Sequence, residues 1–186
     1  MSTQEYNPYR LKELIREKAL KFGEFRLASG KTANYYLDCR NLTLDGEGAN
    51  QIALGMIECL RQIGVPEMVG GMAIGADPIT AAVITCAFQQ GLNIRGFMVR
   101  KEPKAHGTGK LVEGPIVPGA TAVIVEDVIT TGGSSILAIE RCREVGLKVE
   151  HCVCIVDRLA GGAENMAAIG VQLHSLVTIR EMGLDS

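Results

Sequence analysis

No stretch of this sequence is long and apolar enough to cross a bilayer. The longest apolar run, residues 79–88, is interrupted by Thr80 and Thr85, and it falls well short of the ~20 residues that a membrane-spanning helix needs. The N-terminus is polar and charged, so it lacks the apolar core of a secretory signal. We therefore expect a cytoplasmic protein without a membrane partner.

The chain also lacks a surplus of basic residues. Lysine and arginine number 19 against 21 aspartates and glutamates, giving a net charge of −2 and a pI near 6.0. General nucleic-acid binders usually carry a basic surplus, so no nucleic-acid partner is expected. Internal repeats, low-complexity segments and domain linkers are missing too. Because 186 residues suffice for one sizeable core, we expect a single domain over residues 1–186.

Metal-type spacing is missing among the six cysteines. None of them forms a CxxC pair or stands at zinc-ligand spacing from a histidine. Cys152 and Cys154 alternate with Val153 in an apolar run, which predicts that they share one face of a strand as small buried hydrophobes. We favour reduced core thiols over a disulfide or a metal role, and no protein metal site is predicted.

Apolar runs alternate with amphipathic stretches along the chain, with short connections between them. This alternation is typical of an open α/β sheet with parallel strands, in which ligands bind at the carboxyl ends of the strands. The expected helices are 9–22, 50–64, 79–90, 136–145 and 162–169, and the expected strands are two short ones around residues 29–31, then 68–72, 94–99, 122–125, 148–156 and 172–178.

One stretch, residues 121–135, combines several signals of an anion site. Its apolar run, Ala122 to Val125, reads as a strand buried on both faces. Gly132 and Gly133 let the backbone approach an anion closely, and the following helix, with Ser134 or Ser135 as N-cap, would present its N-terminus to a phosphate. No lysine lies in this loop, which excludes a Walker-type cradle.

Two adjacent acids, Glu126 and Asp127, stand between the predicted strand and the loop. Carboxylates beside a phosphate are repulsive unless they serve another group, such as neutral ribose hydroxyls or a magnesium ion carried by the substrate. The pattern therefore favours a phosphosugar. The alternative is that the acid pair only ends a strand and caps a turn.

A long polar connection, residues 100–118, concentrates cations between Arg100 and Lys110. Most charged loops are solvated surface, but a connection of this length is often a functional lid. Its cations suit a pyrophosphate, and closure would exclude water from a reactive intermediate.

These stretches carry a family resemblance. Residues 121–135 resemble the phosphoribosyl pyrophosphate (PRPP) signature of the type I phosphoribosyltransferases. Residues 100–107 resemble the catalytic loop of the orotate phosphoribosyltransferases, and so do Phe22 to Phe25, Ser29-Gly30, the Tyr35-Tyr36 pair and Asp157-Arg158. The resemblance implies the type I fold, in which a mainly parallel sheet is flanked by helices and joined by a small N-terminal hood.

The implied activity is a Mg²⁺-dependent transfer of the phosphoribosyl group from PRPP to orotate, which gives orotidine 5′-monophosphate and diphosphate in pyrimidine (UMP) biosynthesis. The resemblance also implies a homodimer in which the basic loop reaches the partner's active site. The implied catalytic residues are Lys101, Lys104, His106 and Asp127. The implied PRPP contacts are Arg100, Lys101, Lys104, His106, Glu126, Asp127, Val128, Ile129, Thr130, Thr131, Gly132, Gly133 and Ser134, and the implied orotate contacts are Thr130 and Arg158.

The chain departs from the family pattern at two places. Many members carry a lysine at the position of Ala28, and many carry one in the loop that here reads from Ala73 to Asp77. Lys31 or Arg40 are the candidates to replace them. The sequence leaves open whether Tyr35 and Tyr36 pack beside a pyrimidine or in the core.

Two other readings compete with transfer to orotate. One is a transferase of the same superfamily that acts on a purine or another pyrimidine. The pattern of the basic loop and Arg158 favour orotate over those bases. The other is a PRPP-sensing regulator, which would need a nucleic-acid surface that this mildly acidic chain lacks.

Overall fold

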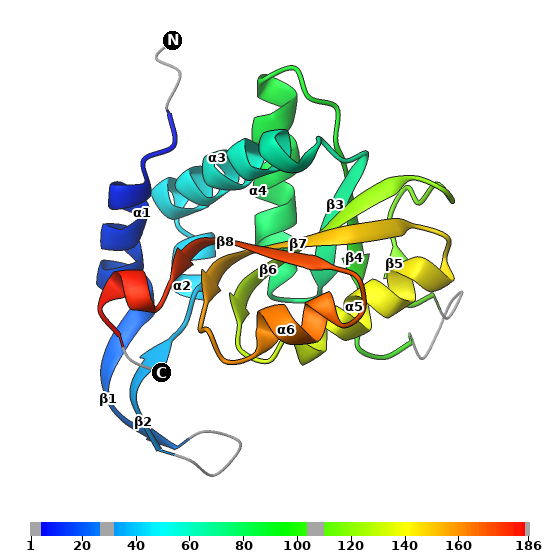
Figure 1. Cartoon of the computed structure of the whole chain (residues 1–186). Coiled ribbons are helices and arrows are strands. Elements are labelled where there is room, and N and C mark those ends of the chain that lie inside the picture. Colours follow the sequence, from blue (N-terminus) through cyan, green and yellow to red (C-terminus); the bar gives the residue numbers. More distant parts are fainter. Residues whose placement is uncertain (1–4, 27–31, 104–109, 185–186) are drawn as a thin grey trace.

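Within residues 5–26, 32–103 and 110–184, which the computed structural model describes, the chain builds a six-stranded sheet (Figure 1). The strand order is β5-β4-β3-β6-β7-β8, and these neighbours are parallel except for β5 with β4. The strands are β3 (Met68–Met72), β4 (Arg95–Val99), β5 (Val112–Glu113), β6 (Thr121–Ile129), β7 (Lys148–Asp157) and β8 (Gln172–Thr178). The predicted α/β class with a mainly parallel sheet is confirmed.

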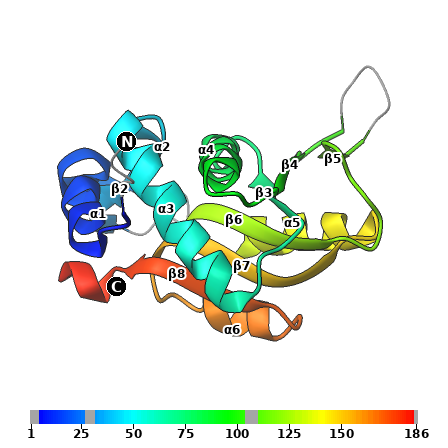
Figure 2. The same cartoon turned by 90° about the horizontal axis from the view of Figure 1, so that it is seen from above.

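The central strands are apolar because helices cover both faces of the sheet. Figure 2 shows α3 (Gly46–Ile63) and α4 (Ala76–Gln89) on one side, and α6 (Gly162–Ala167) on the other. The helix α5 (Gly133–Glu144) packs on the same face as α6. Alternate residues of β7 follow this division: Val153 packs with α3 and α4, whereas Cys152 and Cys154 pack with α5 and α6. The prediction that the two cysteines share one face is confirmed.

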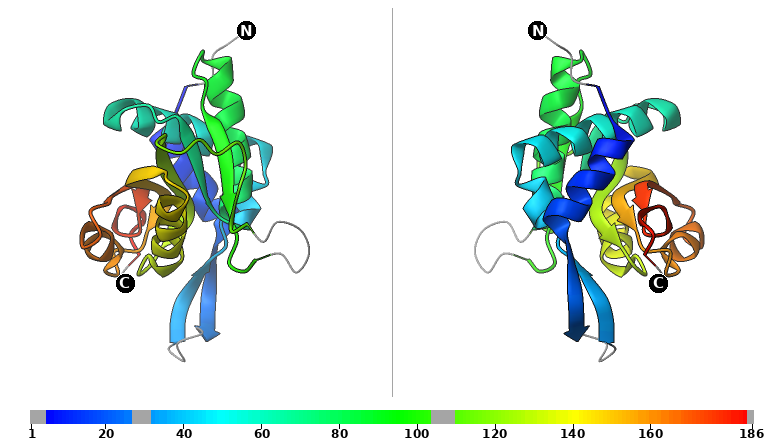
Figure 3. Two further views of the ribbon diagram at one scale, coloured as in Figure 1. Left: turned by 90° about the vertical axis from the view of Figure 1, so that its right-hand side faces the viewer. Right: turned by 90° about the vertical axis from the view of Figure 1, so that its left-hand side faces the viewer.

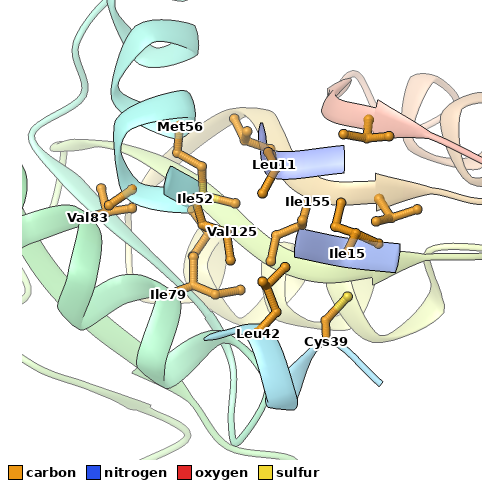
Figure 4. Close-up of a cluster of buried hydrophobic side chains, with 14 of the residues drawn as sticks. Leu11, Ile15, Cys39, Leu42, Ile52, Met56, Ile79, Val83, Val125 and Ile155 are labelled. Atoms are coloured by element: carbon orange, nitrogen blue, oxygen red, sulfur yellow. The ribbon is translucent and has the colours of Figure 1, made fainter. Parts of the chain in front are cut away.

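The larger of the two cores lies between the sheet and the helices α1 (Pro8–Leu14), α3 and α4. In Figure 4 the side chains of Ile52 and Met56 in α3 and Ile79 in α4 meet Val125 of β6, and all four are at most 1% exposed. Burying such a side chain stabilises the fold by roughly 1.5–3 kcal/mol relative to leaving it in water. This packing holds β6, and with it the residues that follow Val125, in a fixed place.

A two-stranded antiparallel sheet precedes the main sheet and forms the predicted hood. Its strands are β1 (Leu20–Arg26) and β2 (Thr32–Leu37), and they project from the body of the molecule (Figure 3). The prediction of one helix over residues 9–22 was wrong at its end, because α1 continues as the π-helix η1 (Ile15–Ala19) and β1 begins at Leu20. Pairing of Leu20 with Leu37 draws these residues into the hairpin.

The structure differs from the predictions at further places. Helix α4 begins at Ala76, within the stretch predicted as a loop, because Pro78 fits the first turn of a helix, where its missing N–H costs no hydrogen bond. Helix α3 begins at Gly46 rather than near residue 50, because the Asp45 side chain accepts a hydrogen bond from Gly48 N and caps the helix. The short helix α2 (Arg40–Thr43) and the strand β5 fall in segments for which no element was predicted. A 3-10 turn, η2 (Arg180–Met182), follows β8.

The six cysteines are free thiols, as predicted, and four of them are buried: Cys39, Cys142, Cys152 and Cys154. Burial raises the pKa of each of these four thiols, so they stay protonated near neutral pH. A search for membrane spans among the described helices finds none with the length and apolar character to cross a bilayer.

Candidate active site

The topology of the sheet creates a crevice where β3 and β6 lie side by side. The helices that follow these two strands, α4 and α5, pack on opposite faces of the sheet. At such a switch point the loops after the two strands separate and leave room for a ligand. Strand β7 lies on the other side of β6 and runs parallel to it. The segments that follow β3, β6 and β7 therefore lie along one edge of the sheet.

A pocket of about 330 Å³ opens at this edge, and residues 126–135 line it. It thus brings together the acid pair, the hydroxyl- and glycine-rich loop and the start of α5. The nine residues of this stretch that the sequence nominated for PRPP all line the pocket, and Ser135 is added to them. Ile129 is buried at 2% exposure, so its side chain serves the core.

The first turn of α5 faces this pocket without a side-chain cap. The N-cap is Gly132, with φ 81°, and not Ser134 or Ser135 as predicted. Only a glycine adopts this left-handed conformation without strain, and a Cβ at this position would also approach Met166 Cε at 3.1 Å. The N–H groups of the first turn therefore remain available, and the helix dipole favours an anion there.

Ser135 forms a hydrogen bond with the acid pair and does not cap the helix. Its hydroxyl, 1% exposed, donates to Glu126 Oε2 at 2.9 Å. The backbone N–H of Asp127 approaches Glu126 Oε1 at 3.2 Å, and that of Val128 donates to Asp127 Oδ1 at 2.7 Å. The acid pair lies inside β6, which continues to Ile129, so the prediction that the strand ends before Glu126 was wrong.

The Glu126 carboxyl group is buried, at 8% exposure. Burial, followed by repulsion from Asp127, raises its pKa to about 7, and the Ser135 hydroxyl opposes the rise. A carboxylate that is costly to ionise in the folded chain is a common property of functional sites. Near neutral pH this group can lose its proton when a ligand offers it hydroxyl donors or a cation.

Replacing Glu126 by glutamine should raise the stability of the ligand-free protein above pH 7. Because the folded chain binds the Glu126 proton more tightly than the unfolded chain, wild type loses stability as the pH rises from about 4.5 to about 7. Each unit between the two pKa values corresponds to about 1.4 kcal/mol, so the penalty is of the order of 3–4 kcal/mol. Urea unfolding at pH 5 and pH 8 measures this difference.

The matched control for this prediction is Glu140→Gln, which removes an exposed carboxylate from α5. That variant should differ from wild type by the same small amount at both pH values. If Glu126→Gln also showed no greater gain at pH 8 than at pH 5, the raised pKa of Glu126 would be disproved.

The loop after β3 approaches the acid pair directly. A Cβ at Gly75 would lie 3.5 Å from Glu126 Oε1 and 3.7 Å from Asp127 Oδ1. This is the loop in which many family members carry a lysine. Arg40, one of the two candidates to replace the missing cations, binds its own neighbour Asp38 through Nε at 2.8 Å and Nη2 at 3.0 Å. Lys31 and Ala28 lie outside the described residues.

The start of the basic loop is anchored on α5. Arg141 donates to the carbonyl oxygens of Arg100 and Lys101, the second at 2.8 Å. Arg100 also forms an ion pair with Glu113 at 3.4 Å, and Lys101 is exposed. Lys104 and His106 lie outside the described residues. Of the two described cations, neither Arg100 nor Lys101 lines the pocket described above.

Arg158 lies at the end of β7, next to the loop after β6. Its backbone N–H donates to Ile129 O at 2.9 Å, and its guanidinium lies against the ring of Tyr35 from the hood. The structure thus places Arg158 between the hood and the pocket. Sequence reasoning missed two supports of this region: the Ser135 hydroxyl on Glu126, and Asn165 Nδ2, which donates to Thr131 O at 2.9 Å.

No cluster of three or more His, Cys, Asp or Glu side chains is placed to hold a metal ion, as far as the described residues go. The two carboxylates at the pocket match the way Mg²⁺ is usually bound in phosphate chemistry, through one or two carboxylates while substrate phosphates and water supply the other ligands. The donor set therefore fits a magnesium ion that arrives with its substrate.

Comparison with known proteins shows which family has this sequence and this fold. Residues 81–174 match the family model of the phosphoribosyl transferase domain. A protein of Rhodopirellula baltica named orotate phosphoribosyltransferase is 54% identical over 177 residues, covering 92% of each chain.

Among solved structures, the orotate phosphoribosyltransferase of Mycobacterium tuberculosis in complex with Fe(III) dicitrate superposes with a TM-score of 0.85 at 36% identity, covering 95% of this chain and 99% of that one. The same enzyme in complex with PRPP gives a TM-score of 0.81 at 32% identity, with the same coverage.

Proposed function

The chain belongs to the orotate phosphoribosyltransferase family, and from this membership we infer that it transfers the 5-phosphoribosyl group of PRPP to orotate. The products are orotidine 5′-monophosphate and diphosphate, a step of pyrimidine biosynthesis. The observation that carries the inference is the pocket of residues 126–135, where the buried Glu126 and the half-buried Asp127 adjoin an uncapped helix N-terminus. A phosphorylated sugar is bound well by such a combination, because its phosphate needs N–H donors and its hydroxyls need carboxylate acceptors.

The 5′-phosphate of PRPP is proposed to bind the loop from Thr131 to Ser134 at the start of α5. There, backbone N–H groups and hydroxyls supply donors, and the helix dipole favours the negative charge. The ribose would then extend toward Glu126 and Asp127, whose carboxylates accept hydrogen bonds from the sugar hydroxyls. Because Asn165 holds Thr131 O, the loop is supported by α6 before any ligand binds.

The proposed function includes a magnesium ion carried by PRPP. When bound, the ion neutralises charge on the diphosphate leaving group. Glu126 and Asp127, the two carboxylates that line the pocket, would contribute to its coordination. The same loss of the Glu126 proton that favours the ribose hydroxyls would favour a divalent cation.

Orotate is proposed to bind through Arg158 and Thr130. Orotate carries a planar carboxylate, and a guanidinium can bind such a group with two parallel hydrogen bonds. Thr130 is exposed and belongs to the pocket, while the backbone of Arg158 is tied to Ile129 beside it. The base would therefore lie next to the ribose, where its N1 can reach the anomeric carbon.

The diphosphate is proposed to be held by Arg100, Lys101, Lys104 and His106, partly across the subunit interface of a homodimer. In one chain, Arg141 fastens the start of the basic loop to α5. Arg141 lies eight residues after Gly133, or about 12 Å along the helix axis from the end that faces the pocket. A loop that begins this far from its own pocket is well suited to cover the pocket of a second copy.

The chemistry asks little of acid–base groups. The bond between the anomeric carbon and the diphosphate oxygen breaks, and N1 of orotate bonds to that carbon through an oxocarbenium-like state. The proton of N1 passes to the departing diphosphate or to water. Asp127 and ionised Glu126 offset the positive charge that develops on the ribose, and the loop cations offset the charge of the diphosphate. Arg158 and Thr130 hold orotate in line for attack, which removes much of the entropic cost.

Mixing the protein with PRPP, orotate and Mg²⁺ tests the proposal. We expect orotate to be consumed and diphosphate released in equal amounts, with no consumption when PRPP or Mg²⁺ is omitted. Adenine, guanine, hypoxanthine and uracil serve as competing acceptors. Consumption of one of these bases in place of orotate would replace the proposed substrate with another, while absence of any transfer would reject the transferase function.

A cytoplasmic location completes the proposal. The six free thiols support it, because disulfides form and persist mainly in oxidising compartments.

A further inference from the structure

Tyr35 of β2 and Arg158 after β7 form a contact that joins the hood to the body of the molecule. Arg158 Nη2 donates to the Tyr35 hydroxyl at 3.1 Å, and Arg158 Cζ lies 5.1 Å from the centre of the Tyr35 ring. The two residues are 123 positions apart in the chain. One side chain therefore restrains the guanidinium in two ways, through a hydrogen bond to its edge and through the ring.

Both partners of this contact are themselves held in place. Tyr35 is 8% exposed and belongs to the larger core. The backbone of Arg158 is fixed by Ile129 O, and the buried Asp157 side chain accepts a hydrogen bond from Leu159 N at 2.8 Å. The turn that carries Arg158 is thus rigid at its base, and Tyr35 restrains the far end of the side chain.

The contact leaves the charge of Arg158 uncompensated. Within the described part of the chain, no Asp or Glu forms an ion pair with Arg158, in contrast to Arg40, which binds Asp38. The hydroxyl of Tyr35 is a neutral acceptor, so it orients the guanidinium without neutralising it. A guanidinium has five N–H donors, and the remaining donors can still bind a carboxylate with two hydrogen bonds.

We propose that Tyr35 is a positioning residue that orients the Arg158 guanidinium for the carboxylate of orotate. This inference rests on the proposed role of Arg158 and adds a role for the tyrosine hydroxyl. Without the hydroxyl, Arg158 keeps its charge and its ring contact but samples more orientations. Orotate must then order the side chain on binding, a cost that a preorganised site avoids.

The test replaces Tyr35 by phenylalanine, which removes only the hydroxyl. We expect the KM for orotate to rise about five- to twenty-fold, as the loss of a charged hydrogen bond and of preorganisation predicts, while the KM for PRPP changes less than about twofold. The matched control is Tyr9→Phe, which removes an exposed hydroxyl from α1 and should leave both constants unchanged. An equal rise in both KM values would mean a general disturbance of the hood and would overturn the proposal.

A double-variant cycle separates this inference from the proposed function. Arg158→Lys keeps the charge but loses the bidentate geometry, so it should raise the KM for orotate by itself. In that background Tyr35→Phe should add less than about twofold, because its effect acts through the guanidinium. Additive effects would overturn the positioning role while leaving Arg158 in place. An unchanged KM in Arg158→Lys would instead reject the assignment of Arg158 to orotate.

A measurement without substrate gives a readout independent of activity. In the ligand-free protein, rotation of the Arg158 guanidinium about its Nε–Cζ bond should be slow, and NMR of arginine side chains labelled with nitrogen-15 should detect this. The rotation should become fast in Tyr35→Phe and stay slow in Tyr9→Phe. Equally fast rotation in wild type and in Tyr35→Phe would overturn the proposal.

Discussion

Mixing the two inactive variants Lys101→Ala and Arg158→Ala should restore about a quarter of wild-type activity per subunit. Each variant alone should lose about 100-fold to 1,000-fold in kcat/KM, because each removes a cation that binds a charged part of the substrates. If Lys101 acts on the partner's pocket, a hybrid dimer has one intact site and one site with both defects. Random exchange makes half of the dimers hybrid.

The recovery depends on subunit exchange and on the loop acting in trans. Exchange can be driven by mild denaturation and refolding of the mixture, and a different affinity tag on each variant lets the hybrid be isolated. The purified hybrid should then have about half of wild-type activity per subunit. If the loop acted on the pocket of its own chain, every site in the hybrid would lack one of the two cations, and no activity would return.

The matched control mixes Lys101→Ala with Lys104→Ala. Both changes lie in the same loop, so each site of that hybrid receives a defective loop whichever chain supplies it. Recovery in this mixture would contradict the complementation argument. A wild-type protein that remained monomeric at assay concentration, yet was active, would contradict the proposed dimer itself.

Most strands of the main sheet were predictable because turn residues separate them from the helices on either side. The bounds of β3 and β8, Met68–Met72 and Gln172–Thr178, agree with those predicted. The end of β6 was not predictable in this way. Glu126 and Asp127 look like the end of a buried strand, but β7 continues beside them, and Ile129 pairs with Asp157. The pairing of two strands depends on both segments, so it cannot be predicted from the hydrophobic pattern of one segment alone.

The same limit applies to the site. The acids, hydroxyls and glycines of residues 126–134 were local signals of a phosphosugar site, and the family resemblance implied all nine residues as PRPP contacts. The structure places all nine around one pocket. Ser135 was assigned to a helix cap because serine commonly has that role. Its hydroxyl instead meets Glu126, and only the packing of α5 against β6 determines this. The contact of Tyr35 with Arg158, across 123 positions, had no local signal at all.

Replacing both acids, Glu126→Gln with Asp127→Asn, should abolish transfer while leaving the protein folded. We expect kcat/KM to fall by at least about 1,000-fold, because the amides cannot offset positive charge on the ribose, and a single lost stabiliser of a transition state costs about 100-fold to 1,000-fold. The ligand-free double variant should unfold at higher urea concentration than wild type at pH 8, since the cost of ionising Glu126 is gone. Glu140→Gln, which removes an exposed carboxylate from α5, is the control for the loss of charge alone.

The pH dependence of PRPP binding separates a direct role of the acids from a structural one. In the proposed function, ribose hydroxyls and Mg²⁺ bind the ionised form of Glu126, whose pKa of about 7 in the free protein leaves it largely protonated at pH 6. The affinity for PRPP in the presence of Mg²⁺ should therefore rise from pH 6 to pH 8 and level off above that range. Calorimetric titration at several pH values measures it.

PRPP itself titrates in this range, and Glu126→Gln alone shows how much of the pH dependence belongs to the ligand. The change of affinity with pH that remains in Glu126→Gln comes from PRPP, and the part of the change that disappears in this variant comes from Glu126. If the slopes of wild type and Glu126→Gln were the same, Glu126 would not lose a proton on binding. A double variant that bound and converted PRPP as well as wild type would mean that the sugar binds away from the acid pair, although the uncapped start of α5 and the buried carboxylate adjoin the same pocket.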